Sequence, residues 1–155
     1  MLIQATFPTP SLTIAGRVFT DLSNLIQLVA FVNGVGTGFC TFRKIGGVGG
    51  YTPSGAKSFR LAALQVEPTV AFATAGSIFY SDNDLGVATN TAPINPVYPG
   101  GASGTGQSIP LVAASNGSVV YQKAIDFTVI NGKFLGITTA NQNTTGSIYA
   151  WGYEI

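Results

Sequence analysis

The stretch SIYAWGYE, residues 147–154, alternates between two kinds of side chain with a strict period of two. Tyr149, Trp151 and Tyr153 fall on one face of an extended chain, and smaller side chains fall on the other. This alternation predicts a β-strand with two different faces. The aromatic row is then either packing within the protein, a surface that binds a partner, or a platform for a sugar ring.

The rest of the chain repeats this strand-and-turn pattern. Short β-branched or aromatic runs lie between clusters of Gly, Thr, Ser, Asn and Pro, which is typical of an all-β sandwich or barrel. We predict a jelly-roll-like antiparallel β-sandwich. The expected strands are Ser11–Ile14, Gly38–Lys44, Ser58–Gln65, Thr69–Ala73, Ser77–Tyr80, Ser118–Tyr121, Ile125–Ile130, Lys133–Thr138 and Ser147–Glu154.

One segment fits two interpretations. Between Thr20 and Gly34 the apolar residues follow helical spacing, with Thr20 or Asp21 available to cap a helix start and Asn33-Gly34 to end it. A short helix that leads into a buried strand fits equally well. The sequence therefore leaves open one short helix near residues 21–33.

Two turn regions help to organise the chain. Asn131-Gly132, flanked by two apolar runs, predicts a β-hairpin with a type I′ turn, in which both runs pair with each other. Residues 88–110 contain four prolines and four glycines, which makes a ladder-forming strand implausible there. We expect a long surface loop at about 88–110 within a single domain that covers residues 1–155.

The composition excludes several classes of function. Only 8% of the 155 residues are charged and the formal net charge is +1, so no basic surface for nucleic acid is expected. The chain has no histidine, which excludes Ser-His-Asp and Cys-His catalysis and histidine-ligated metals. The single cysteine, Cys40, lies in a strand-like run and is expected to be buried. We expect no enzyme activity and no cofactor.

No targeting or membrane segment is evident. No apolar run reaches the roughly 18 residues that suggest a membrane span, and the first residues lack the basic start and apolar core of a signal peptide. The expectation is synthesis in the cytoplasm and no membrane partner.

The densest acidic cluster is YSDNDLG, residues 80–86. An EF-hand calcium loop that began at Asp82 would need glycine at position 87 and glutamate at position 93. The chain has Val87 and Pro93 there, so the sequence does not match this motif. Asp82 and Asp84 are better explained as turn residues whose side chains bond their own backbone. We predict no metal site, although a structural cation on non-standard ligands stays open.

Four segments carry a resemblance to a known family: TPSGAKSFRL at 52–61, YSDNDLG at 80–86, NPVYPGGASGTG at 95–106 and SIYAWGYEI at 147–155. Together they resemble the small β-rich virion proteins of tailed bacteriophages, in particular the jelly-roll decoration, or cement, proteins of phage heads. The resemblance implies a non-enzymatic homotrimer on the outer capsid surface, made in the host cytoplasm, that binds the major capsid protein and stabilises the head.

Candidate residues follow for this function and for one alternative. The partner-binding candidates are Tyr98 in the long loop and the aromatic row Tyr149, Trp151 and Tyr153. The alternative is a carbohydrate- or receptor-binding β-sandwich module of the tail-fibre or adhesin type. Its candidate sugar-binding residues are Tyr80, Asp82, Asp84 and Trp151.

Overall fold

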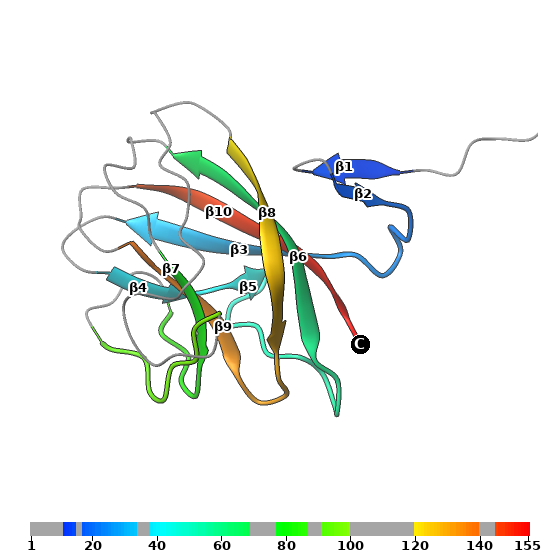
Figure 1. The fold of residues 1–155 in the computed structure, drawn as a ribbon. Coiled ribbons are helices and arrows are strands. Elements are labelled where there is room, and N and C mark those ends of the chain that lie inside the picture. The colour runs from blue at the N-terminus through cyan, green and yellow to red at the C-terminus, as the bar shows by residue number, and fades with distance from the viewer. Residues whose placement is uncertain are drawn as a thin grey trace, which may run out of the picture.

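The structure is a computed structural model that describes residues 11–14, 17–33, 38–68, 77–86, 91–99, 120–139 and 145–155. These residues form ten strands and contain no helix (Figure 1). The strands are β1 (Leu12–Ile14), β2 (Arg17–Phe19), β3 (Ile26–Asn33), β4 (Gly38–Thr41), β5 (Arg43–Lys44), β6 (Phe59–Pro68), β7 (Ser77–Ser81), β8 (Val120–Val129), β9 (Phe134–Thr139) and β10 (Thr145–Glu154). The predicted all-β class is confirmed.

The strands form two packed sheets and a separate hairpin, and every pairing is antiparallel. One sheet has the order β5-β3-β10-β6-β8, the other has the order β4-β9-β7, and β1 pairs only with β2. After β3 the chain alternates between the two large sheets, apart from the short edge strand β5. This arrangement of two antiparallel sheets, with β10 between β3 and β6, is a jelly-roll-like β-sandwich.

The ambiguous segment near residues 21–33 is a turn followed by a strand. Residues 22–24 form the turn, and β3 runs from Ile26 to Asn33 in register with β10. Pairing along eight residues satisfies the backbone of β3, so the helical spacing of its apolar residues does not decide its structure. The optional helix is therefore absent from this segment.

The predicted Gly38–Lys44 strand is divided between the two sheets. β4 pairs with β9, whereas β5 pairs with β3. Phe42 lies between these two strands, is 0% exposed, and has its amide bonded to the Leu135 carbonyl at 2.8 Å. A buried aromatic side chain at the crossing point thus fixes the passage of the chain from one layer to the other.

The Asn131-Gly132 turn forms, but the predicted hairpin pairing is wrong. β8 pairs with β6 and β9 pairs with β4 and β7, so the turn connects the two layers. The amide of Lys133 donates to the Ile130 carbonyl at 3.2 Å, and only Gly132 of the two central residues has a positive φ, at 78°. This is the pattern of a type II turn, which splays its flanking strands where a type I′ turn would align them.

The remaining strand predictions agree with the structure to within a few residues, with two exceptions. The two predicted runs 118–121 and 125–130 are represented by one long strand, β8, over residues 120–129, and residues 118–119 lie outside the described residues. The predicted strand Thr69–Ala73 also lies outside them. Within the predicted loop 88–110, Val97 forms an antiparallel bridge with Tyr80. That segment therefore lies along β7, at the edge of the three-stranded sheet.

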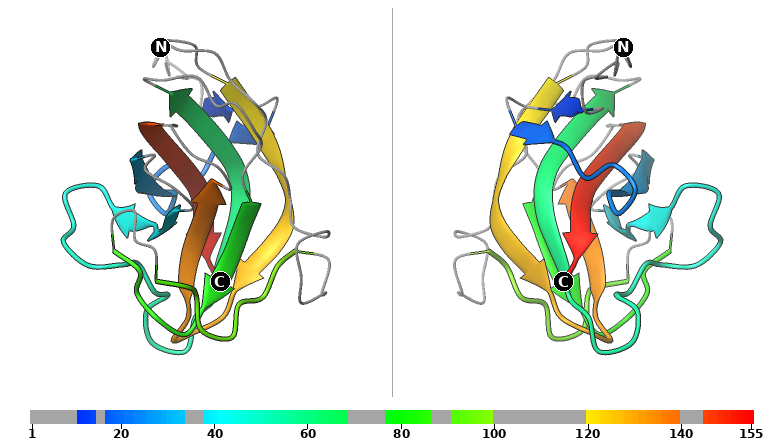
Figure 2. Two further views of the ribbon diagram at one scale, coloured as in Figure 1. Left: turned by 90° about the vertical axis from the view of Figure 1, so that its left-hand side faces the viewer. Right: turned by 90° about the vertical axis from the view of Figure 1, so that its right-hand side faces the viewer.

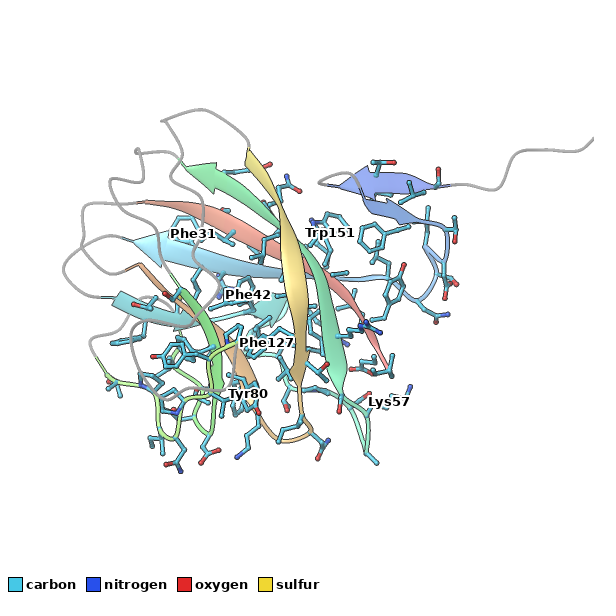
Figure 3. The ribbon with its side chains drawn as sticks, viewed as in Figure 1. Phe31, Phe42, Lys57, Tyr80, Phe127 and Trp151 are labelled. Carbon is cyan, nitrogen blue, oxygen red and sulfur yellow. The ribbon has the colours of Figure 1, made fainter. Side chains whose placement is uncertain are left out.

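Two hydrophobic clusters lie on the two faces of the five-stranded sheet. The larger cluster fills the space between the sheets and includes Phe42 and Phe127, which Figure 3 labels, together with Cys40, buried as predicted. The smaller cluster lies on the outer face, where Phe19 of β2 and Leu12 of β1 pack against β6 and β10. The β1–β2 hairpin therefore covers one part of the outer face.

Candidate functional site

The outer face of the five-stranded sheet carries apolar side chains away from the hairpin. Leu28 and Ala30 of β3 belong to the core between the sheets, so Val29 and Phe31 point outward. Tyr149 of β10 lies directly opposite Val29 and shares its face. Phe31 remains 41% exposed, and Figure 3 shows it toward the far end of β3 from the hairpin.

The loop after β5 adds an exposed apolar side chain next to this face. Residues 45–50 (IGGVGG) leave β5 through a turn in which the Gly47 amide donates to the Lys44 carbonyl at 2.8 Å. Val48 is 97% exposed and lines a small surface hollow together with Phe31. Figure 2 shows this loop projecting from the side of the sandwich. We call Val29, Phe31, Val48 and Tyr149 the docking patch.

The neighbours of the docking patch are both charged and uncharged. Gln65 lies opposite Tyr149 and Ser147 lies opposite Phe31. Arg43 of β5 pairs directly with Val29, and Arg43 and Asp84 line the same hollow as Phe31 and Val48. The central part of a protein–protein interface is depleted of charged residues and enriched in aromatic ones. The four residues of the docking patch are themselves uncharged, and the charged side chains of Arg43 and Asp84 border them, as polar residues do at the rim of an interface.

The predicted aromatic row contributes to two different regions. Tyr149, Trp151 and Tyr153 do share the outer face, but only Tyr149 belongs to the docking patch. Trp151 and Tyr153 pack in the smaller hydrophobic cluster, where the ring centroids of Tyr153 and Phe19 are 5.9 Å apart. The Trp151 indole nitrogen is buried and has no hydrogen-bond partner among the described residues. These two rings hold the hairpin on the sheet.

Tyr98 packs against the second sheet. The Tyr80–Val97 bridge places Tyr98 beside Phe79, and their ring centroids are 5.8 Å apart. Burial raises the pKa of the Tyr98 hydroxyl above its usual value. Phe79 itself is 0% exposed. Tyr98 thus covers a buried phenylalanine on the outer face of β7.

The four predicted sugar-binding residues do not form one site. Trp151 lies on the outer face of the five-stranded sheet, whereas Tyr80 stacks on Phe127 between the sheets, with ring centroids 5.4 Å apart and planes at 24°. Figure 3 shows Trp151 and Tyr80 in separate parts of the molecule. Asp82 and Asp84 follow β7, at the same end as Tyr80.

Asp84 connects three backbone segments. Its carboxylate accepts hydrogen bonds from the Thr41 hydroxyl, from the Gly50 amide at 2.8 Å and from the Gly86 amide at 2.9 Å. Burial alone would raise the pKa of Asp84, but these three hydrogen bonds outweigh it and hold the pKa below its usual value. The bond to Gly86 is the Asx turn predicted for this cluster.

Asp82 and Glu154 make similar connections at the same end of the sandwich. Asp82 pairs with Lys133 and accepts from Asn95 at 2.8 Å. Glu154 accepts from the Ser54 hydroxyl at 2.6 Å and from the Tyr51 hydroxyl at 2.7 Å. The bonds from Lys133 and Ser54, respectively, are the main cause of the lowered pKa values of Asp82 and Glu154. We call Asp82, Asp84 and Glu154 the tether carboxylates.

The tether carboxylates predict a fall in stability in acid. Their folded-state pKa values lie below the ordinary 3.8 of Asp and 4.5 of Glu. Their contribution is therefore fully present above about pH 5 and is lost as pH falls through the folded pKa values. Because the chain has no histidine, the free energy of unfolding should change little between about pH 6 and 8.

Urea denaturation at pH 7, 5, 4 and 3 measures this dependence. The midpoint should stay nearly constant down to pH 5 and then fall. The double variant Asp84→Asn, Glu154→Gln is the control, and it should be less stable at pH 7 but lose less on acidification. An equal acid-induced loss in both proteins would show that the tether carboxylates do not cause it.

Some functional candidates were missed by the sequence interpretation. Val48 was not among the candidate residues, although a lone valine among glycines has no neighbours to bury it and so predicts exposure. The partners of Glu154 are about 100 residues away in sequence, and no local pattern connects them. Asn131 similarly donates to the Pro53 carbonyl at 3.2 Å and to that of Gly55.

The described residues hold no group of three or more His, Cys, Asp or Glu side chains placed to bind a metal ion. Within the same residues no helix has the length and apolar character needed to span a membrane.

The fold and its surfaces define an antiparallel β-sandwich with an apolar patch on one sheet. Comparison of the chain with protein-family models, with curated proteins and with solved structures found no match.

Proposed function

We propose that this protein is a non-enzymatic virion structural protein, a decoration protein that binds and stabilises the head of a tailed bacteriophage. The docking patch is the observation that carries this proposal. Phe31 and Val48 are exposed apolar side chains that line one surface hollow, and burial of such side chains by a partner is favourable. The partner is the major capsid protein.

Three further features support a binding role. Jelly-roll-like sandwiches serve as capsid and lectin domains and as cupins, which is an analogy at the level of the fold. Cupin metal chemistry requires ligands that a chain without histidine lacks. The tether carboxylates stabilise the fold, because each is bonded to at least two residues that are distant from it in sequence.

The alternative of a carbohydrate- or receptor-binding module has less support from its predicted residues. Trp151 is packed beneath the hairpin, and Asp82 and Asp84 are engaged in structural hydrogen bonds. The docking patch therefore gives more support to a protein partner than the four candidate sugar-binding residues give to a sugar.

Binding to phage heads tests the proposal. The protein is added to undecorated heads of the phage that encodes it, and their resistance to heat or chemical disruption is measured. Saturable binding and raised resistance are expected. Val48→Asp and Phe31→Asp should weaken binding at least tenfold, since each would bury a charge against an apolar partner surface.

The matched control is Ile94→Asp. Ile94 is 54% exposed but lies in the loop beside β7, outside the docking patch. This variant should bind like the wild type. Absence of binding, or equal losses in the control and patch variants, would contradict the proposal. Light scattering of the free protein should give the mass of a homotrimer.

A further inference from the structure

A second surface feature lies at the hairpin end of the outer face. The polar linker between β2 and β3 and the neighbouring ends of β6 and β10 enclose an open cleft of about 610 Å³. Small-molecule sites usually measure roughly 300–1,000 Å³. Lys57 lines the cleft, and Figure 3 shows it just before β6. The cleft is separate from the docking patch and shares no residue with it.

The charges that line the cleft are balanced. Lys57 and Arg60 are opposed by Asp21 and Glu154. Glu154 already accepts hydrogen bonds from Ser54 and Tyr51, and its interaction with Lys57 helps to lower its pKa. An anionic ligand would be repelled by the two carboxylates, and a cationic ligand would be repelled by Lys57 and Arg60. The lining therefore favours a neutral ligand that both donates and accepts hydrogen bonds.

Asp21 is held in place as an acceptor. Its carboxylate receives hydrogen bonds from the Ser23 hydroxyl at 3.1 Å and from the Asn24 amide nitrogen at 3.0 Å. The bond from Asn24 is the main cause of its lowered pKa, so Asp21 is ionised at neutral pH. A carboxylate has about four acceptor sites, so acceptor capacity remains for a ligand. Arg60 supplies planar donors in the same cleft.

The cleft also has an apolar part. Tyr153 and Ala62 line it and belong to the smaller hydrophobic cluster, and the contact with Phe19 fixes the position of the Tyr153 ring. Tyrosine combines a rigid apolar ring with a polar hydroxyl. A ligand that matches this lining has one apolar face and a rim of hydroxyl groups.

We propose that this cleft binds a neutral saccharide, with the C–H face of a sugar ring toward Tyr153 and its hydroxyls bonded to Asp21 and Arg60. The site differs from the sugar site that the sequence suggested, because Tyr80, Asp82, Asp84 and Trp151 do not line it. It is an activity additional to capsid binding and does not depend on it.

A panel of neutral and acidic oligosaccharides on a glycan array, followed by calorimetric titration of the hits, tests the proposal. At least one neutral saccharide should bind with a Kd in the micromolar to millimolar range. Asp21→Ala and Arg60→Ala should each weaken binding at least tenfold. Both side chains are exposed, so thermal unfolding should confirm that the variants remain folded.

Lys44→Ala is the matched control, because Lys44 is an exposed cation on β5, outside the cleft. It should bind the saccharide like the wild type. Binding of no neutral saccharide, binding of acidic sugars alone, or unchanged affinity in both cleft variants would overturn the assignment. The cleft variants should still dock on phage heads, so failure of this site is distinguishable from failure of the capsid proposal.

Discussion

Phe79→Ala is expected to lower the free energy of unfolding by about 3–5 kcal/mol, the usual cost of truncating a fully buried phenylalanine. Phe79 lies on the outer face of the second sheet yet is 0% exposed. Phe39 and Tyr98 contact its ring, with centroids 6.2 and 5.8 Å away, and Gly136 leaves room for it on β9. Removal of the ring would leave a cavity beneath the segment that ends in Tyr98.

Equilibrium urea denaturation measures this loss, and Phe31→Ala is its control. Phe31 is the same residue type on a strand but is 41% exposed, so its truncation should cost less than about 1 kcal/mol. Similar losses in both variants would contradict the assigned burial of Phe79.

A double mutant tests the geometry more directly. A Cβ added at Gly136 would lie 2.6 Å from the Phe79 ring. Gly136→Ala should therefore destabilise the wild type but cost much less in the Phe79→Ala background, because contacting residues do not contribute additively. Additive losses would show that the two residues do not touch.

The second large effect is expected at Gly152 in the central strand β10. A Cβ there would collide with the Arg60 carbonyl oxygen and lie 2.6 Å from the Phe59 ring. The β10–β6 register shifts between Trp151 and Gly152, which brings the two backbones together. Because a backbone atom cannot move aside as a side chain can, Gly152→Ala should cost about 3 kcal/mol, the upper part of the range for overpacking.

Gly49→Ala is the control for this prediction. An added Cβ at Gly49 meets nothing within 4 Å. This change should alter the free energy of unfolding by less than about 0.5 kcal/mol. Both variants are compared by thermal and urea unfolding, and a Gly152→Ala protein as stable as the Gly49→Ala protein would refute the close approach.

The fold class could be predicted because most strands carry their own periodicity. Residues 147–154 alternate strictly, and the structure places this segment in the middle of the larger sheet. The pairing of the strands was harder to predict from the sequence than the strands themselves. Asn131-Gly132 has the chemistry of a tight turn, but the local sequence does not distinguish a turn within a sheet from one between sheets. That choice depends on β6 and β7, which are distant in sequence.

The candidate site was only partly predictable for the same reason. Tyr149, Trp151 and Tyr153 were correctly placed on one face, but the hairpin that covers part of that face begins more than 120 residues earlier. Tyr98 follows a proline-rich run that gave no sign of the Val97 bridge. Exposure is a property of the assembled layers, so the docking patch could not be identified from alternation alone.

The position of β10 also affects how the protein is made. β10, residues 145–154, lies between β3 and β6, so these two strands do not pair with each other. The larger sheet therefore cannot close until β10 has left the ribosome, and until then β3 and β6 each have an unpaired edge. Such edges invite pairing with other chains. Maturation should consequently depend on translation speed and on holding factors that shield β3 and β6 during synthesis.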